Sequence, residues 1–276
     1  MKLNIAIVGH GFVGKAVDYG FPSQNCEKYI VDPKHGMDIT ALPQNMDYIF
    51  VCVPTPMGDD GSIDSSIIES VVSYLLTNNK GIIIIKSTVT PEILKQFSDS
   101  RVVYNPEFLT EKSANEDFVN PFMHIFGGHP LYTQRVEELY KYYSICKPCP
   151  TYHMSTIEAS FVKYGINSFL ATKVLWFNQF YDIIQKENAN YGKIISAITT
   201  DSRVGRSHTT VPGFDGKRGY GGSCFPKDTL AFVKYAKSLK NDFSVLEKVI
   251  IENNKYRSKY KKDQREMEQN ISYDTK

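Results

Sequence analysis

The sequence predicts an α/β fold, a doubly wound parallel sheet followed by a mainly helical second domain, with a long helix linking the two. Short β-rich runs recur through the first half of the chain and alternate with helix-length segments, which is typical of a parallel sheet covered on both faces. From Ser155 onward the chain keeps helical spacing of apolar residues without a proline until about Glu187. We therefore expect a sheet domain at 1–154, the connecting helix with a helical catalytic and dimerisation domain at 155–262, and a polar tail at 263–276.

The composition is that of an ordinary soluble protein. The 276 residues suffice for two domains, and a net charge of +2 gives no reason to expect a nucleic-acid partner. The N-terminus does not read as a signal peptide, and no apolar run approaches the ~20 residues that span a bilayer, so no membrane partner is expected. The five cysteines are odd in number and scattered, which favours a reducing, cytoplasmic compartment and neither a disulfide framework nor a metal site.

The first strand-like run, 3–8, leads directly into a glycine-rich turn. The turn has GxGxxG spacing and consists of Gly9, His10, Gly11, Phe12, Val13 and Gly14. Such glycines permit a tight turn, close approach of a pyrophosphate and close helix–strand packing, so we expect a Rossmann-like dinucleotide site, with a purely structural turn as the alternative. A second strand ends at Asp32, where a carboxylate binds a ribose hydroxyl pair and repels a 2′-phosphate. The predicted cofactor is therefore NAD.

Polar residues follow the later strands of the predicted sheet. Ligands of parallel sheets bind beyond the carboxyl ends of the strands, so polar side chains there are candidates for a site. One such residue alone would be explained as loop polarity, whereas several at the ends of strands in one sheet favour a site. The candidates are Thr55, Ser87, Thr88, Glu107 and Glu111.

The long helix begins at a capping box, with Ser155 at the N-cap and Glu158 three residues later. At 1.5 Å per residue, about 32 residues make a rod of roughly 48 Å, which is long for a small domain. We expect this helix to link two domains or to form the interface of a homodimer. Lys163 and Asn167 are neighbours on one of its faces, and a solvated face is the alternative explanation for them.

A second glycine-rich turn precedes Cys224 and the lysine and carboxylate at Lys227 and Asp228. If this turn opens a helix, Cys224 lies at the helix N-terminus, where the dipole and unpaired N–H groups favour a thiolate. Asp228 then lies one turn on, on the same face. The pattern predicts a nucleophile with a polar partner, and a merely buried cysteine is the alternative.

Together these motifs resemble the UDP-glucose/GDP-mannose dehydrogenase family. The resemblance covers about residues 1–250 in the family's order, and its most specific parts are the cysteine block and the block at 105–111. The matching segments are 9–14, 53–56, 86–89, 105–111, 116–118, 163–167, 201–205 and 219–229.

Members of this family oxidise a sugar primary alcohol to a carboxylate with two NAD in succession, and the resemblance implies the same chemistry here. The implied nucleophile is Cys224, which captures the aldehyde as a thiohemiacetal that becomes a thioester. The other implied catalytic residues are Lys163 and Asn167 for the oxyanion, Asp228 and Thr88 for the catalytic water, Glu111 as its base, and Glu107 for acid–base work or substrate contact. The implied cofactor-binding residues are Gly9, Gly11, Phe12, Val13, Gly14, Asp32, Val53, Thr55, Ser87, Thr88, Glu111 and Lys227. The implied substrate-binding residues are Phe108, Leu109, Lys163, Asn167, Arg203, Tyr220 and Gly221.

The sequence departs from the family pattern in two places. The family continues into a third domain that holds the UDP, and this sequence stops before it, so we expect substrate affinity to be weakened or to depend on a partner. Lys112 stands where the family usually has glycine. The motifs look more like the UDP-glucose branch, whose product would be UDP-glucuronate, a precursor for polysaccharides.

Two other functions fit parts of the pattern. A non-catalytic NAD- or nucleotide-sugar-binding protein, or half of a two-chain enzyme, would keep the same motifs. A 3-hydroxyacid dehydrogenase shares the two-domain arrangement and a lysine on the linking helix, but its hydride transfer needs no nucleophile such as Cys224.

Overall fold

The computed structural model describes residues 2–274. The chain forms two compact units. The first comprises residues up to Thr55 and Asp64–Lys163, and the second comprises Pro56–Ile63 and the residues from Tyr164 onward. The predicted boundary at 154/155 lies at the start of the long helix, whereas the boundary between the units lies inside that helix.

The first unit is built on a seven-stranded sheet in the order β2-β1-β3-β4-β5-β6-β7. The strands are β1 (Leu3–Val8), β2 (Cys26–Val31), β3 (Tyr48–Val51), β4 (Ile82–Ile85), β5 (Val102–Tyr104), β6 (His124–Gly127) and β7 (Thr151–Met154). Strands β1 to β5 pair in parallel, as expected. The predicted parallel arrangement is interrupted only where β6 pairs antiparallel to β5, through Tyr104 and Gly127.

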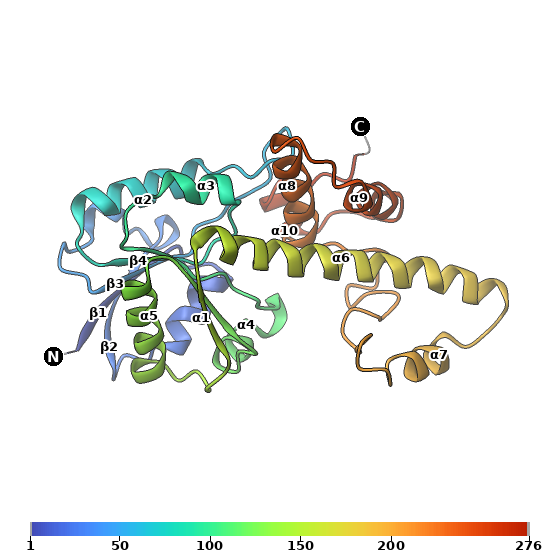
Figure 1. Cartoon of the computed structure of the whole chain (residues 1–276), viewed down its shortest axis with the longest axis horizontal. Coiled ribbons are helices and arrows are strands. Elements are labelled where there is room, and N and C mark those ends of the chain that lie inside the picture. The colour runs from blue at the N-terminus through green and yellow to red at the C-terminus, as the bar shows by residue number, and fades with distance from the viewer. Residues whose placement is uncertain (1, 275–276) are drawn as a thin grey trace. The chain divides into compact units, whose positions relative to one another are not determined.

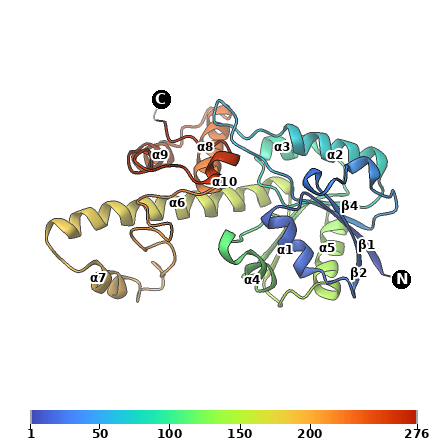
Figure 2. The ribbon, with the colours of Figure 1, turned by 180° about the vertical axis from the view of Figure 1, so that it is seen from behind.

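Helices cover both faces of this sheet. Figures 1 and 2 show α2 and α3 on one face and α1, α4 and α5 on the other. The helices are α1 (Phe12–Gly20), α2 (Ser66–Asn78), α3 (Pro91–Gln96), α4 (Ala114–Val119) and α5 (Pro130–Tyr143). Strand β4 consists of four isoleucines, all buried, as expected for a strand with helices on both sides. The doubly wound prediction is thereby confirmed, and its switch point lies between β1 and β3.

The second unit is helical. After α6 (Thr156–Lys186) its helices are α7 (Tyr191–Ile198), α8 (Phe225–Ser238), α9 (Ser244–Arg257) and α10 (Gln264–Glu268). The capping box predicted for α6 is present, because the Ser155 N–H donates to the Glu158 carboxylate and the Glu158 N–H donates to the Ser155 hydroxyl. Among residues 2–274 no helix is both long and apolar enough to cross a membrane.

The prediction of a polar tail at 263–276 is wrong for residues 263–274, which the structure describes. Glu266, Ile271 and Tyr273 are buried, and Ile271 and Tyr273 pack in an apolar cluster with Met57. The sequence pattern could not predict the burial of these residues. A short segment in which polar and apolar residues alternate is equally compatible with an exposed chain end. Residues 275 and 276 of the predicted tail lie outside the described residues.

Candidate active site

The glycine-rich turn after β1 has the geometry of a dinucleotide-binding loop. Gly9 has φ +89°, and a Cβ there would lie 2.6 Å from the Cys52 carbonyl oxygen. A Cβ on Gly14 would overlap the Gly9 carbonyl. A Cβ on Gly11, in contrast, would meet nothing within 4 Å. The protein itself therefore needs glycine at the first and last positions, and the open space at Gly11 fits a pyrophosphate lying against the backbone.

Asp32 follows β2, as a ribose-binding carboxylate would. Its side chain accepts hydrogen bonds from the backbone N–H groups of His10 (2.7 Å) and Lys34 (2.8 Å). Burial opposes ionisation of Asp32, but these two N–H donors outweigh it and hold the pKa of the carboxyl below its usual value. The carboxylate is thus ionised beside the glycine turn, as the preference for NAD over NADP requires.

Three of the five polar residues predicted at the strand ends, Thr55, Ser87 and Thr88, follow two neighbouring strands of the sheet. Val53 and Thr55 follow β3, and Ser87 and Thr88 follow β4, which is its parallel neighbour. The Thr55 hydroxyl donates to the Thr88 carbonyl (3.0 Å), and the Ser87 hydroxyl donates to the Val53 carbonyl (2.6 Å). All four side chains are less than a tenth exposed, so these bonds fix the loops at the carboxyl edge.

Glu107 and Lys163 form a buried ion pair in the first unit. Lys163 Nζ lies 3.2 Å from Glu107 Oε1 and donates to the Glu107 carbonyl oxygen at 2.5 Å. The other carboxylate oxygen accepts from the Leu109 N–H at 2.6 Å. The ammonium also lies 5.3 Å from the centre of the Phe108 ring. This buried cation is thus anchored to the block 105–111, where the resemblance places substrate contacts.

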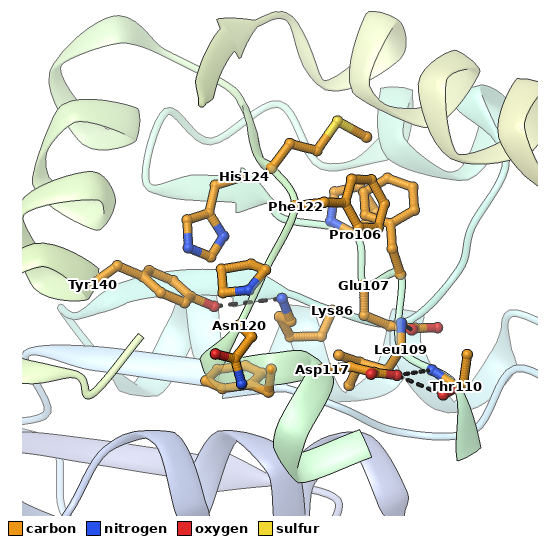
Figure 3. Close-up of a pocket in the computed structure, with 14 residues that line it drawn as sticks. Lys86, Pro106, Glu107, Leu109, Thr110, Asp117, Asn120, Phe122, His124 and Tyr140 are labelled. Atoms are coloured by element: carbon orange, nitrogen blue, oxygen red, sulfur yellow. Dashed lines mark hydrogen bonds between the residues drawn. The ribbon is translucent and has the colours of Figure 1, made fainter. Parts of the chain in front are cut away.

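A cavity of about 230 Å³ adjoins this block. Its wall includes Glu107, Phe108, Leu109, Lys86, His124 and Tyr140, and Figure 3 shows Lys86 pointing toward the Tyr140 hydroxyl. Burial lowers the pKa of Lys86 to about 8, and burial, together with the Lys86 charge, lowers the pKa of His124 to about 4. The cavity combines aromatic walls with a buried amine, which suits a polar ligand.

Sequence reasoning missed Lys86 as a functional candidate. Its Nζ donates to the Asn105 side chain at 2.9 Å, and the Tyr140 hydroxyl donates to the same oxygen at 2.8 Å. Lys86 therefore fixes the residue that begins the block containing Glu107. The available signal was a lysine directly after a strand of buried isoleucines, a position where a charge needs a partner.

In the second unit Cys224 is the N-cap residue of α8, as predicted. Its side chain is half-buried, with Sγ 3.7 Å from the Ser223 hydroxyl oxygen. The Asp228 N–H donates to the Cys224 carbonyl at 2.9 Å, which closes the first turn of the helix. The helix dipole at this end favours a thiolate on Cys224.

Asp228 is the centre of a buried polar network beside that cysteine. Its side chain is 1% exposed, and one oxygen accepts from Asn167 Nδ2 while the other accepts from Lys227 Nζ, both at 2.6 Å. Asn167 and Lys227 are each 6% exposed. A buried carboxylate with an ammonium and an amide donor is fully satisfied and fixed in orientation. The structure thus brings Asn167 of α6 against the adjacent pair Lys227 and Asp228 at the start of α8.

The remaining candidates lie in more varied surroundings. Tyr220 is buried and Gly221 packs so closely against the Arg257 guanidinium that a Cβ would overlap it. Glu111 begins the short helix η3 (Glu111–Ser113) and is exposed. Arg203 lies on a surface loop with 87% of its side chain accessible, where its guanidinium binds the Asp201 carboxylate.

Two family models match the chain, one for each unit's main part. Residues 33–144 match the UDP-glucose/GDP-mannose dehydrogenase family NAD binding domain, and residues 157–255 match the central domain of the same family. The first match identifies NAD as the cofactor, in agreement with the space at Gly11.

Individual relatives agree with these matches. The UDP-glucose 6-dehydrogenases of Bacillus subtilis and Campylobacter jejuni are 32% and 33% identical over 84% and 78% of this chain. The aligned parts cover 52% and 54% of those proteins, so the chain spans about half the length of the curated relatives it matches.

Several solved structures share the fold of this chain. A UDP-glucose dehydrogenase from Pyrobaculum islandicum superposes with a TM-score of 0.77 at 25% identity, over 92% of this chain and 68% of that one. A 3-hydroxyisobutyrate dehydrogenase from Mycobacterium tuberculosis superposes with a TM-score of 0.70 at 15% identity, over 91% of this chain and 93% of that one, which shows a common fold.

Proposed function

The chain belongs to the UDP-glucose/GDP-mannose dehydrogenase family, and on that premise we propose that it oxidises the primary alcohol of a nucleotide sugar to a carboxylate. UDP-glucose, giving UDP-glucuronate, is the first candidate substrate. The observation that carries the proposal is Cys224 at the N-terminus of α8 beside the buried Asn167–Asp228–Lys227 network. A dehydrogenase that stopped at the aldehyde would have no use for a nucleophile held in this way.

Most of the residues proposed to bind NAD belong to the first unit. Gly9, Gly11 and Gly14 would receive the pyrophosphate, with Phe12 and Val13 beginning the helix behind it, and Asp32 would bind the ribose. The loop residues Val53, Thr55, Ser87 and Thr88 would line the nicotinamide end, together with Glu111 and Lys227. When bound, NAD accepts the hydride in each of the two oxidation steps.

Cys224 makes the second oxidation possible. Its thiolate adds to the aldehyde carbon, and the oxygen that takes up the electron pair becomes a thiohemiacetal alkoxide. Loss of a hydride from that carbon gives a thioester, and water then displaces the thiolate to release the carboxylate. Lys163 and Asn167 would donate to the oxygen as its charge develops. Asp228 and Thr88 would hold the water, and Glu111 would take its proton.

Substrate contacts are proposed for the cavity block and the cysteine turn. Phe108 and Leu109 line the cavity in the first unit, and Glu107 holds Lys163 beside them. Tyr220 and Gly221 belong to the turn before Cys224. Arg203 is exposed on its loop and forms an ion pair with Asp201. To bind the nucleotide, it would have to leave Asp201 and pair with a phosphate group.

We further propose a homodimer formed through α6. Phe169, Trp176 and Ile183 recur at heptad spacing on this helix, and their side chains are 68%, 53% and 62% exposed. Three large apolar side chains in one exposed row are typical of a helix face that packs against a partner. The reducing, cytoplasmic setting predicted from the cysteines also belongs to this proposal, because the reaction requires Cys224 as a thiol.

The alternative is a protein that binds NAD and a nucleotide sugar without turnover. The chain spans about half the length of the curated relatives it matches. The test is NADH formation, counted per active site, with UDP-glucose, GDP-mannose and a 3-hydroxyacid as separate substrates. Sustained turnover with one nucleotide sugar supports the proposal, and binding without NADH supports the alternative.

A further inference from the structure

The backbone of the glycine turn before Cys224 is held by side chains from later in the chain. The Tyr220 N–H donates to the Asn253 side-chain oxygen at 2.7 Å, and the Asn253 amide donates back to the Tyr220 carbonyl at 3.0 Å. The Arg257 guanidinium donates to the Gly219 carbonyl at 2.9 Å. Asn253 and Arg257 are both less than a tenth exposed. Helix α9 therefore fixes the first half of the turn.

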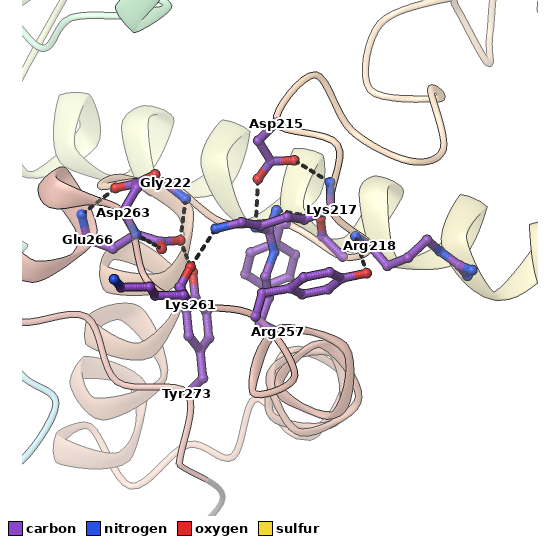
Figure 4. A network of polar contacts seen from close by, with 12 residues as sticks. Asp215, Lys217, Arg218, Gly222, Arg257, Lys261, Asp263, Glu266 and Tyr273 are labelled. Atoms are coloured by element: carbon purple, nitrogen blue, oxygen red, sulfur yellow. Dashed lines mark hydrogen bonds and ion pairs between the residues drawn. The ribbon is translucent and has the colours of Figure 1, made fainter.

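Glu266 of α10 fixes the second half. One of its carboxylate oxygens accepts from the Gly222 N–H at 3.0 Å and from the Tyr273 hydroxyl at 2.6 Å, as Figure 4 shows. The other accepts from the Asp263 N–H at 3.0 Å. The Glu266 side chain is 1% exposed, so these donors are what satisfy its carboxylate. Gly222 has φ +76°, and a glycine released from this bond has many other conformations open to it.

Helix α10 is anchored by the residues that follow it. Five residues are too few for a helix to be stable alone, so tertiary contacts must hold it. Ile271 is fully buried, and it packs with Tyr273, Met57 and Leu230. The Met57 N–H also donates to the Gln269 carbonyl at 3.1 Å. These contacts keep Glu266 in place against the turn.

We propose that Glu266 and Tyr273 are positioning residues for Cys224. By holding Gly222, two residues before the cysteine, they fix the orientation of the thiol at the N-terminus of α8. The inference rests on the proposed function, because it takes Cys224 as the nucleophile. It assigns a role in the reaction to residues beyond the matched central domain, which ends at 255.

Four variants of the 276-residue chain test the proposal. Glu266→Ala removes the acceptor for Gly222, and Glu266→Gln keeps an acceptor oxygen but removes the charge. Tyr273→Phe removes one hydrogen bond and keeps the ring. Glu268→Ala is the matched control, because Glu268 is exposed on the same short helix. The measurements are kcat, KM for NAD, the thermal midpoint, and the pH dependence of Cys224 alkylation by iodoacetamide, followed by peptide mass.

Glu266→Ala is expected to lower kcat about tenfold while KM for NAD stays unchanged, because neither Glu266 nor Gly222 is among the residues proposed to bind NAD. The pH midpoint of Cys224 alkylation should rise by about one unit, because the released turn no longer holds the thiolate against the helix N-terminus. Removing the negative charge of Glu266 by itself would favour the thiolate and lower the alkylation midpoint. A rise in the midpoint is therefore evidence for loss of the hydrogen bond to Gly222. Glu266→Gln should recover most of the wild-type kcat, with an alkylation midpoint at or below the wild-type value, and Glu268→Ala should behave as the wild type.

A folded Glu266→Ala protein with the wild-type alkylation profile would overturn the proposal. If Glu266→Ala does not fold, Tyr273→Phe serves as the test. We then expect a smaller rise in the pH midpoint of Cys224 alkylation. An unchanged midpoint in Tyr273→Phe would contradict the positioning role. The alkylation comparison does not depend on turnover. Absence of NADH formation by the wild type would therefore count against the proposed function and leave this test intact.

Discussion

Lys163 and Glu107 form a buried ion pair in which Nζ lies 3.2 Å from one carboxylate oxygen, with the side chains 3% and 6% exposed. The same ammonium donates to the Glu107 backbone oxygen. Removing either partner of such a pair leaves an uncompensated charge in a site with little water. The pair thus links a residue proposed for oxyanion stabilisation to the block that lines the cavity.

Replacing the lysine should harm both stability and catalysis. Lys163→Met leaves the Glu107 carboxylate buried without its cation, so we expect the free energy of unfolding to fall by about 3 kcal/mol. Loss of an oxyanion donor should lower kcat by about 10²- to 10³-fold. Urea unfolding and steady-state NADH formation measure the two effects. The double variant Lys163→Met with Glu107→Gln should recover stability but not activity, and recovery of both would contradict the catalytic role.

Two glycines of the nucleotide turn should respond in opposite ways to alanine. At Gly11 a Cβ meets nothing, so Gly11→Ala should change the free energy of unfolding by less than about 0.5 kcal/mol. Its dissociation constant for NAD should rise at least about tenfold, because the methyl group occupies the space of the pyrophosphate. Gly14→Ala should lose stability, because the Cβ overlaps the Gly9 carbonyl. Thermal unfolding and NAD titration check both, and tight NAD binding by Gly11→Ala would contradict the assigned site.

The sequence predicted the parallel part of the sheet and the cysteine at the start of α8, because both depend on local signals. Runs of apolar residues identify buried strands, and glycine turns mark where they end. The reversal at β6 was not predictable, because strand direction is set by long-range pairing that leaves no local signal. The same holds for the hydrogen bond between Glu266 and Gly222, because the two residues lie 44 positions apart in the sequence. The Asn167–Asp228 contact likewise joins two helices, and only the family resemblance suggested it.

Asp228 should matter most after the thioester has formed. Asp228→Ala removes the acceptor for Asn167 and Lys227 and the proposed support for the catalytic water. We expect rapid NADH formation in the first turnover, followed by a covalent sugar adduct on Cys224 that hydrolyses slowly. Intact-protein mass spectrometry during turnover detects that adduct. Steady turnover at the wild-type rate, without an adduct, would rule out this role for Asp228.

The half-buried His124 should make the first unit less stable in acid. Its pKa is lowered to about 4 by burial and by the Lys86 charge, whereas the unfolded chain protonates at its usual value of 6.5. Between these values the unfolded state binds more protons, so stability falls as the pH drops through this window. His124→Phe should remove this loss and gain up to about 3 kcal/mol over the wild type near pH 4. Urea unfolding at several pH values tests this, with His35→Phe as an exposed control. If the free energy of unfolding changed with pH in the same way in the wild type and in His124→Phe, the proposed effect of His124 would be contradicted.

The number of NADH formed per UDP-glucose consumed, measured for the wild type and Cys224→Ser, decides whether the chain carries out a cysteine-dependent four-electron oxidation. We expect sustained turnover with two NADH per sugar for the wild type, because an alcohol becomes a carboxylate by loss of four electrons. For Cys224→Ser we expect no sustained turnover. One NADH per sugar with an aldehyde product, or full activity without the cysteine, would contradict it.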